Sequence, residues 1–130
     1  MNIGLLEDNP AIADYLSIAL EMAGHNVDTY TYGSSLLEKL DDSMVGSSYA
    51  SLPYDLIIVD LLLPGDISGL KAIQQIQRAI PHEQLPIIII SAGSQGELAQ
   101  VRALLPQVPL LRKPFRRQAL LQLISALESR

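Results

Sequence analysis

The sequence predicts an α/β fold, a doubly wound sheet of five parallel strands with helices on both faces. Two aliphatic runs, 56–59 and 87–90, contain no charged side chain and are bounded by polar and turn-forming residues. A continuous run of this kind is typical of a strand buried on both faces, in the middle of a parallel sheet. Segments with strand character alternate five times with segments of helical character. This alternation predicts βα units that return the chain each time to a parallel strand.

Five strands and five helices are expected along the chain. The strands cover residues 3–6, 26–32, 56–60, 87–90 and 108–111. The helices cover residues 10–23, 35–40, 70–80, 97–105 and 116–128. In the first, third and last helices, apolar side chains recur three or four residues apart, so one face of each can pack against the sheet.

Local signals mark the ends of the first elements. Asn9 can cap a helix and Pro10 fits its first turn, so the first helix follows directly after an acidic turn. Gly24 ends this helix. Residues 26–32 alternate in polarity, which predicts a half-exposed strand at an edge of the sheet.

The second helix is expected to be short and to be followed by a long surface loop. Ser35 and Glu38 have the spacing of a capping box, which predicts a helix that continues to about Leu40. Residues 41–53 are polar and rich in Ser and Gly, without helical or strand periodicity. Such a composition favours a loop on the surface.

Prolines separate the later elements. Pro81 stops the third helix, and Pro86 opens the second aliphatic strand, which ends at Ser91. The fourth helix ends before Pro106. The last helix is expected to turn four aliphatic side chains inward: Leu120, Leu123, Ile124 and Leu127.

Length and composition restrict the class of protein. With 130 residues, of which 48% are hydrophobic, the chain can form one compact domain over residues 1–130. Its net charge of −5 argues against a nucleic-acid-binding surface. There is no cysteine, no signal peptide at the start and no apolar run of membrane-spanning length. We therefore expect a cytoplasmic protein that contacts neither nucleic acid nor membrane.

Polar side chains stand at four of the five strand exits. They are Glu7 and Asp8 after the first strand, Asp60 after the third, Ser91 after the fourth and Lys113 after the fifth. With the strand order 2-1-3-4-5, these side chains converge on the crevice at the carboxyl ends of the strands, where open α/β sheets bind ligands.

This set of side chains suits phosphoryl transfer. Three carboxylates in one crevice repel each other unless a cation lies among them, and hard oxygen ligands suit Mg²⁺. The metal, Lys113 and the hydroxyl of Ser91 would hold the oxygens of a phosphoryl group while Asp60 attacks it. The sequence thus predicts in-line transfer to a carboxylate, promoted by charge neutralisation and positioning.

The ordered set resembles the receiver domain of two-component response regulators. It comprises Glu7-Asp8, Asp60 with Pro64, Ser91-Ala92 and Lys113-Pro114-Phe115, and it spans the whole chain. The resemblance implies a phosphorelay switch that changes conformation on phosphorylation and catalyses only its own phosphorylation and dephosphorylation. It also implies a sensor histidine kinase or phosphotransfer protein as the phosphodonor.

The resemblance assigns a role to each residue of the set. Asp60 would be the phosphoacceptor. Asp8, Asp60 and the backbone carbonyl of Leu62 would hold Mg²⁺ directly, and Glu7 would do so through water. Ser91 would hydrogen-bond the phosphoryl group, and Lys113 would form an ion pair with it.

Three features concern the region that reads out phosphorylation. The family's bond at Lys113-Pro114 is commonly cis, which implies the same here. The family's switch aromatic is replaced by Leu110, so the usual coupling of Ser91 to an aromatic rotamer cannot operate in that form. A homodimer or output partner is expected on the fourth helix, last strand and final helix.

Three alternatives can be compared with this interpretation, and the sequence fits the second and third poorly. A receiver-like module that binds a partner without accepting phosphate is consistent with Leu110. A haloacid-dehalogenase-type phosphatase needs a second acid two residues after the nucleophile, where Leu62 stands. A flavodoxin would place an FMN phosphate beside Glu7 and Asp8, which would repel it.

Overall fold

Five parallel strands form a single sheet in the order β2-β1-β3-β4-β5. The computed structural model describes residues 1–43, 52–61 and 68–129. The strands are β1 (Asn2–Leu6), β2 (Asn26–Tyr30), β3 (Leu56–Asp60), β4 (Ile87–Ser91) and β5 (Leu110–Arg112). Every neighbouring pair is parallel. The predicted fold class and strand order are confirmed.

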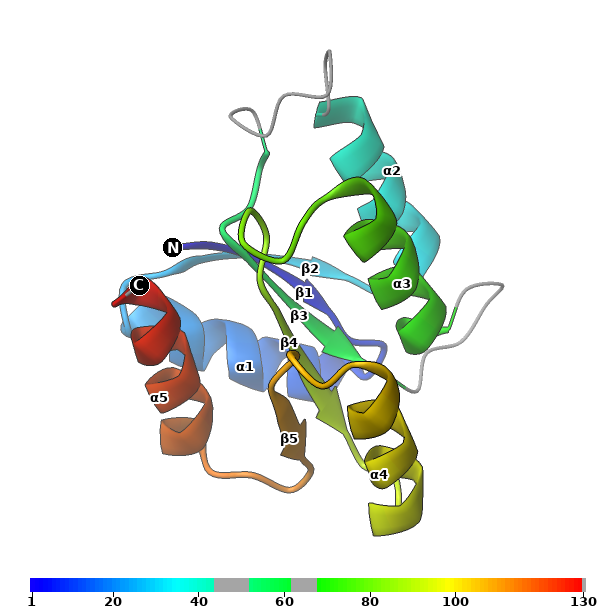
Figure 1. Ribbon diagram of the computed structural model, residues 1–130. Coiled ribbons are helices and arrows are strands. Elements are labelled where there is room, and N and C mark those ends of the chain that lie inside the picture. Colours follow the sequence, from blue (N-terminus) through cyan, green and yellow to red (C-terminus); the bar gives the residue numbers. More distant parts are fainter. Residues whose placement is uncertain (44–51, 62–67, 130) are drawn as a thin grey trace.

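Helices cover both faces of the sheet (Figure 1). On one face lie α1 (Pro10–Met22) and α5 (Arg117–Glu128). On the other face lie α2 (Gly33–Ser43), α3 (Gly69–Ala79) and α4 (Gln95–Leu104). Within the described part of the chain, none of these helices has the length and apolar character needed to cross a lipid bilayer.

Strands β3 and β4 have no exposed residue. Successive side chains of β3 enter opposite cores, because a strand points its residues alternately to the two faces. Ile57 and Val59 pack in the core beneath α2 and α3, and Leu56 and Ile58 pack in the core beneath α1 and α5. Each fully buried aliphatic side chain contributes about 1.5–3 kcal/mol through the hydrophobic effect. This burial fixes the ends of β3 and β4, and so the positions of the groups that follow.

Some element ends differ from the prediction. Helix α2 begins at Gly33, so Ser35 lies within its first turn, and the expected cap at Ser35 is wrong. The Ser35 amide already donates to the carbonyl of Tyr32. Helix α2 also continues to Ser43, and residues 44–51 of the expected loop lie outside the described residues. Strand β5 covers residues 110–112 rather than 108–111, although Val108 is buried.

Side-chain caps fix the helices that border the carboxyl edge of the sheet. The Asn9 side chain accepts hydrogen bonds from the amides of Ala11 and Ile12 at 3.0 and 3.2 Å, as its cap role predicts. Ser94 and Glu97 form a capping box at the start of α4. Both α1 and α4 therefore begin at fixed positions beside the strand exits.

Candidate functional site

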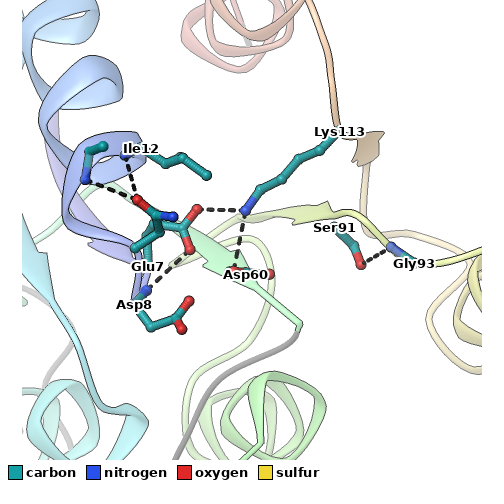
Figure 2. A network of polar contacts seen from close by, with 9 residues as sticks. Glu7, Asp8, Ile12, Asp60, Ser91, Gly93 and Lys113 are labelled. Atoms are coloured by element: carbon teal, nitrogen blue, oxygen red, sulfur yellow. Dashed lines mark hydrogen bonds and ion pairs between the residues drawn. The ribbon is translucent and has the colours of Figure 1, made fainter.

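The groups predicted at the strand exits lie together at the carboxyl edge of the sheet (Figure 2). Glu7 and Asp8 follow β1, Asp60 ends β3, and Ser91 ends β4. Lys113 follows β5, which pairs with β4 and places Arg112 opposite Ser91. The strand order thus brings together residues that are more than one hundred positions apart in the chain.

Lys113 links two buried carboxylates. Its Nζ donates to Glu7 Oε1 at 2.6 Å and to Asp60 Oδ2 at 3.3 Å. The side chain of Glu7 is fully buried, and that of Asp60 is 5% exposed. Burying a charge without a partner is costly, so the ammonium group is the counter-ion that keeps these carboxylates at the site.

The electrostatics of the cluster favour protonation of Glu7. Burial raises the pKa of Glu7 to about 7, and its contact with the Asp60 carboxylate acts in the same direction, while Lys113 opposes the shift. Burial alone would lower the pKa of Lys113. The hydrogen bond that Lys113 donates to Glu7 and the charges of both carboxylates outweigh this effect, so the pKa of Lys113 is raised.

Glu7 predicts a pH dependence of stability in the absence of divalent metal. Its pKa is about 7 in the folded protein and 4.5 ordinarily, so between these values the folded state binds more protons than the unfolded state. The free energy of unfolding should therefore fall as pH rises through this range. Thermal unfolding in chelator at pH about 5.5 and about 7.5 measures the slope.

Replacing Glu7 by the corresponding amide tests whether Glu7 causes this pH dependence, and Glu83 provides the control. Glu7→Gln should flatten the slope because the titrating group is gone. Glu83→Gln, at an exposed glutamate before β4, should keep it. A slope that persists unchanged in Glu7→Gln would contradict the assignment to Glu7.

Three carboxylates at this edge can hold a metal ion. Oxygens of Glu7, Asp8 and Asp60 all lie within 4.8 Å of one another. Carboxylate oxygens are hard donors of the kind that Mg²⁺ and similar cations prefer, and this spacing allows them to share one ion. Asp8 is half-buried and the other two are buried, so the donor set opens to solvent on one side.

Main-chain hydrogen bonds hold the acidic turn in place. The Glu7 amide donates to the carbonyl of Tyr30 on β2 at 3.0 Å. The Asp8 amide donates to Glu7 Oε2 at 3.1 Å. Since Asn9 caps α1 immediately afterwards, the two acids have little freedom to move apart.

Ser91 is buried at the end of β4 and is held from two sides. Its Oγ accepts a hydrogen bond from the Gly93 amide at 3.1 Å, and its carbonyl accepts one from the Lys113 amide at 2.7 Å. The hydroxyl hydrogen of Ser91 can then be donated to an oxygen of a bound group. The peptide bond between Lys113 and Pro114 is cis.

Comparison with protein families decides what kind of domain carries this cluster. The sequence model of the response regulator receiver domain matches residues 3–125, nearly the whole chain. The chain belongs to the response regulator receiver family.

Two curated relatives of this receiver domain are named as transcriptional regulators. The DNA-binding dual master transcriptional regulator RpaA of Synechocystis sp. is 33% identical over 92 residues, which are 70% of this chain and 34% of the relative. The phosphate regulon transcriptional regulatory protein PhoB of Rhizobium meliloti is 33% identical over 102 residues, which are 78% of this chain and 40% of the relative. The receiver domain thus spans little more than a third of the length of these relatives.

Solved structures share the fold of the receiver domain. The chemotaxis protein CheY4 of Vibrio cholerae superposes with a TM-score of 0.77 at 21% identity and covers 97% of both chains. A putative response regulator of Chloroflexus aurantiacus gives a TM-score of 0.78 at 26% identity, covering 99% of this chain and 98% of that one. The likeness extends over all five βα units.

Of two further predicted positions, Leu110 and Leu62, the structure describes only Leu110. Leu110 is half-buried and, like Val101 and Leu105, packs against the core beneath α2 and α3. It lies there as an aliphatic packing residue. Leu62, whose backbone carbonyl is the predicted third metal ligand, lies outside the described residues.

Gly69 is a site residue that the sequence did not single out. A Cβ at this position would clash with the carbonyl oxygen of Asp60 and would lie 2.6 Å from the Cα of Leu61. The Gly69 amide donates to the Leu61 carbonyl at 3.3 Å. The only signal in the sequence is a glycine at the start of the helix after β3, which local reasoning assigns to a turn.

Proposed function

We propose that this receiver domain accepts a phosphoryl group on Asp60 in a Mg²⁺-dependent reaction and thereby acts as a signalling switch. The observation that carries the proposal is Lys113, whose ammonium group reaches both Asp60 and Glu7 inside a cluster of three carboxylates. Glu7, Asp8 and Asp60 are the residues that would hold Mg²⁺. When bound, Mg²⁺ would neutralise charge on the phosphoryl oxygens.

Asp60, Lys113 and Ser91 have different roles in the transfer. An oxygen of Asp60 attacks the phosphorus of the donor, a new P–O bond forms, and the bond to the donor's leaving group breaks. Lys113 forms an ion pair with one phosphoryl oxygen, and Ser91 donates its hydroxyl hydrogen to another. Because Lys113 and Ser91 are in place before the reaction, they can stabilise the negative charge that develops on the phosphoryl oxygens during it. The domain modifies only itself, and it is not an enzyme acting on other substrates.

Labelling by a small phosphodonor tests the proposal. Acetyl phosphate carrying a radioactive phosphoryl group should label the protein in the presence of Mg²⁺ and leave it unlabelled when a chelator is added. The label should be lost in hydroxylamine, because an acyl phosphate is a mixed anhydride whose carbonyl carbon hydroxylamine attacks, releasing phosphate. A wild-type protein that stays unlabelled would contradict phosphorylation and favour the module that only binds a partner.

The phosphodonor in the cell would be a sensor histidine kinase or a phosphotransfer protein. A pocket of about 460 Å³ beside Lys113 supports a protein donor. It is lined by Ile12, Tyr15, Leu16, Ala92, Lys113, Pro114 and Phe115. On helix α1, which supplies part of this lining, Tyr15 and Ile18 are each more than half exposed. An apolar surface of this kind is typical of protein contact sites. Transfer from a purified phosphorylated histidine-containing domain would test this partner.

The output of the receiver is a separate proposal. Helix α4 exposes Leu104, 60% accessible, beside β5, and a second copy or an output partner on α4, β5 and α5 stays a prediction. Size-exclusion chromatography before and after phosphorylation would test a second copy.

We also propose that the domain acts in the cytoplasm and contacts no DNA itself. Cell fractionation would check the first statement, and a DNA-binding assay with this chain would check the second.

A further inference from the structure

The outward face of helix α1 carries an apolar stripe. Its members, Tyr15, Ile18 and Met22, are 56%, 57% and 78% exposed and follow one another at intervals of three and four residues. The inward face of the same helix is already buried in the core, at Leu16 and Leu20. A helix that is apolar on all sides is normally covered on all sides. The stripe is therefore expected to meet another surface.

Acidic side chains border one side of this stripe. Helix α1 contains two acids, Asp14 and Glu21, and no basic residue. With about 3.6 residues per turn, both acids lie on the same side of Ile18, and Tyr15 lies on the other side. Both acids are exposed, and in the part of the chain that the structure describes neither forms an ion pair.

Two arginines border the opposite side of the stripe. Helix α5 lies beside α1 (Figure 1), and Arg116 and Arg117 stand at its start. Together with Tyr15, Phe115 and Gln118 they line a pocket of about 390 Å³, which places both arginines on the Tyr15 side of the stripe. Both are exposed, and neither forms an ion pair with another described residue. The stripe thus has negative charge along one side and positive charge along the other.

This arrangement of charge is complementary to itself. When two copies pair about a two-fold axis parallel to α1, their stripes face each other, and the acidic side of each helix lies opposite the arginine side of the other. Because Asp14 precedes Tyr15, Asp14 of one copy comes level with Arg116 and Arg117 of the second copy. An antiparallel pairing would place acids against acids and arginines against arginines. Charge therefore favours the parallel pair.

We propose that a second copy of this chain covers the outward face of α1 in the unphosphorylated protein. The apolar stripes are in contact, and Asp14 of each copy pairs with Arg116 and Arg117 of the other. The contact is small, so the dimer is weak and forms only at high protein concentration. Tyr15 also lines the pocket beside Lys113, so a second copy and a protein donor would occupy this face in turn.

Sedimentation velocity of the chain without phosphodonor tests the second copy. The wild type should shift from monomer to dimer between about 1 µM and about 500 µM, the range of a small interface. Ile18→Glu changes an exposed residue at the centre of the stripe, so it should keep the fold and stay monomeric. Leu104→Glu is the matched control: it changes an exposed leucine of α4, on the other face of the sheet, and should dimerise like the wild type.

Charge reversal tests how the two copies are oriented. Asp14→Arg should raise the dimer dissociation constant about tenfold or more, because the two-fold axis repeats the repulsion at two places. The double variant Arg116→Glu, Arg117→Glu should have the same effect and keep its fold, since acids at the start of α5 suit the helix dipole. Mixing these two variants should restore association, because every pair across the interface then joins opposite charges.

These outcomes do not depend on the proposed function, since no phosphate is needed. A wild type that stays monomeric at about 500 µM would overturn the second copy. Loss of transfer from a phosphorylated histidine-containing domain in a monomeric Ile18→Glu would then assign the face to the donor instead. A dimer that Leu104→Glu breaks and Ile18→Glu leaves intact would place the interface on α4 and refute the proposal. An Asp14→Arg that dimerises as tightly as the wild type, or a mixture that stays monomeric, would contradict the parallel pairing.

Discussion

Replacing Asp60 by asparagine is expected to abolish phosphate incorporation from acetyl phosphate. Asparagine has nearly the same shape, but its amide is a poor nucleophile and cannot form the acyl phosphate. Neighbouring carboxylates should not substitute, since Lys113 and the end of β3 direct the reaction to one position. Labelling should fall from close to one phosphate per chain to background, measured by radioactivity at saturating donor and Mg²⁺.

The fold of Asp60→Asn should survive the change. Asp60 is 3% exposed, and neutralising it relieves its repulsion with the Glu7 carboxylate, while Glu7 keeps its ion pair with Lys113. The thermal unfolding midpoint should therefore stay at or above that of the wild type. A matched control is Asp55→Asn, an exposed acid directly before the same strand, which should be labelled normally. Labelling of Asp60→Asn at the wild-type level would show that the acceptor lies elsewhere.

The ends of β3 and β4 could be predicted from the sequence, because a strand buried on both faces is an uninterrupted run of aliphatic residues that stops where the strand ends. Strands β3 and β4 contain only aliphatic residues up to Asp60 and Ser91, and every residue of both is buried. Once these ends were placed, the topology of parallel βα units brought Lys113 toward Asp60. The convergence of the site therefore follows from periodicity and strand order.

Other features depend on packing that a linear pattern does not contain. Strand β5 has three residues, and pairing with Ile89, Ile90 and Ser91 decides which residues belong to it. Helix α2 starts two residues before the capping pair, because the bond from the Ser35 amide to Tyr32 extends the first turn.

Gly69→Ala is expected to damage both the fold and the phosphorylation site. The added methyl group would overlap the Asp60 carbonyl oxygen, and Leu61 Cα would lie only 2.6 Å away. Both are main-chain atoms at the end of a fully buried strand, so neither can swing aside as a side chain could. The start of α3 or the end of β3 must shift. We expect a loss of about 1–3 kcal/mol in the free energy of unfolding, measured in urea.

The same shift would move the phosphoacceptor. Displacing a reacting group by an ångström can cost about a hundredfold in rate, so labelling of Gly69→Ala should be slowed by about tenfold or more. Gly96→Ala is the matched control, because a Cβ there would meet only Ser94 Oγ, at 3.9 Å. It should label normally and gain about 0.4–1 kcal/mol, as alanine restricts the unfolded chain. Equal stability of the two variants would show that β3 and α3 can separate freely, and that the position of Asp60 does not depend on the glycine behind it.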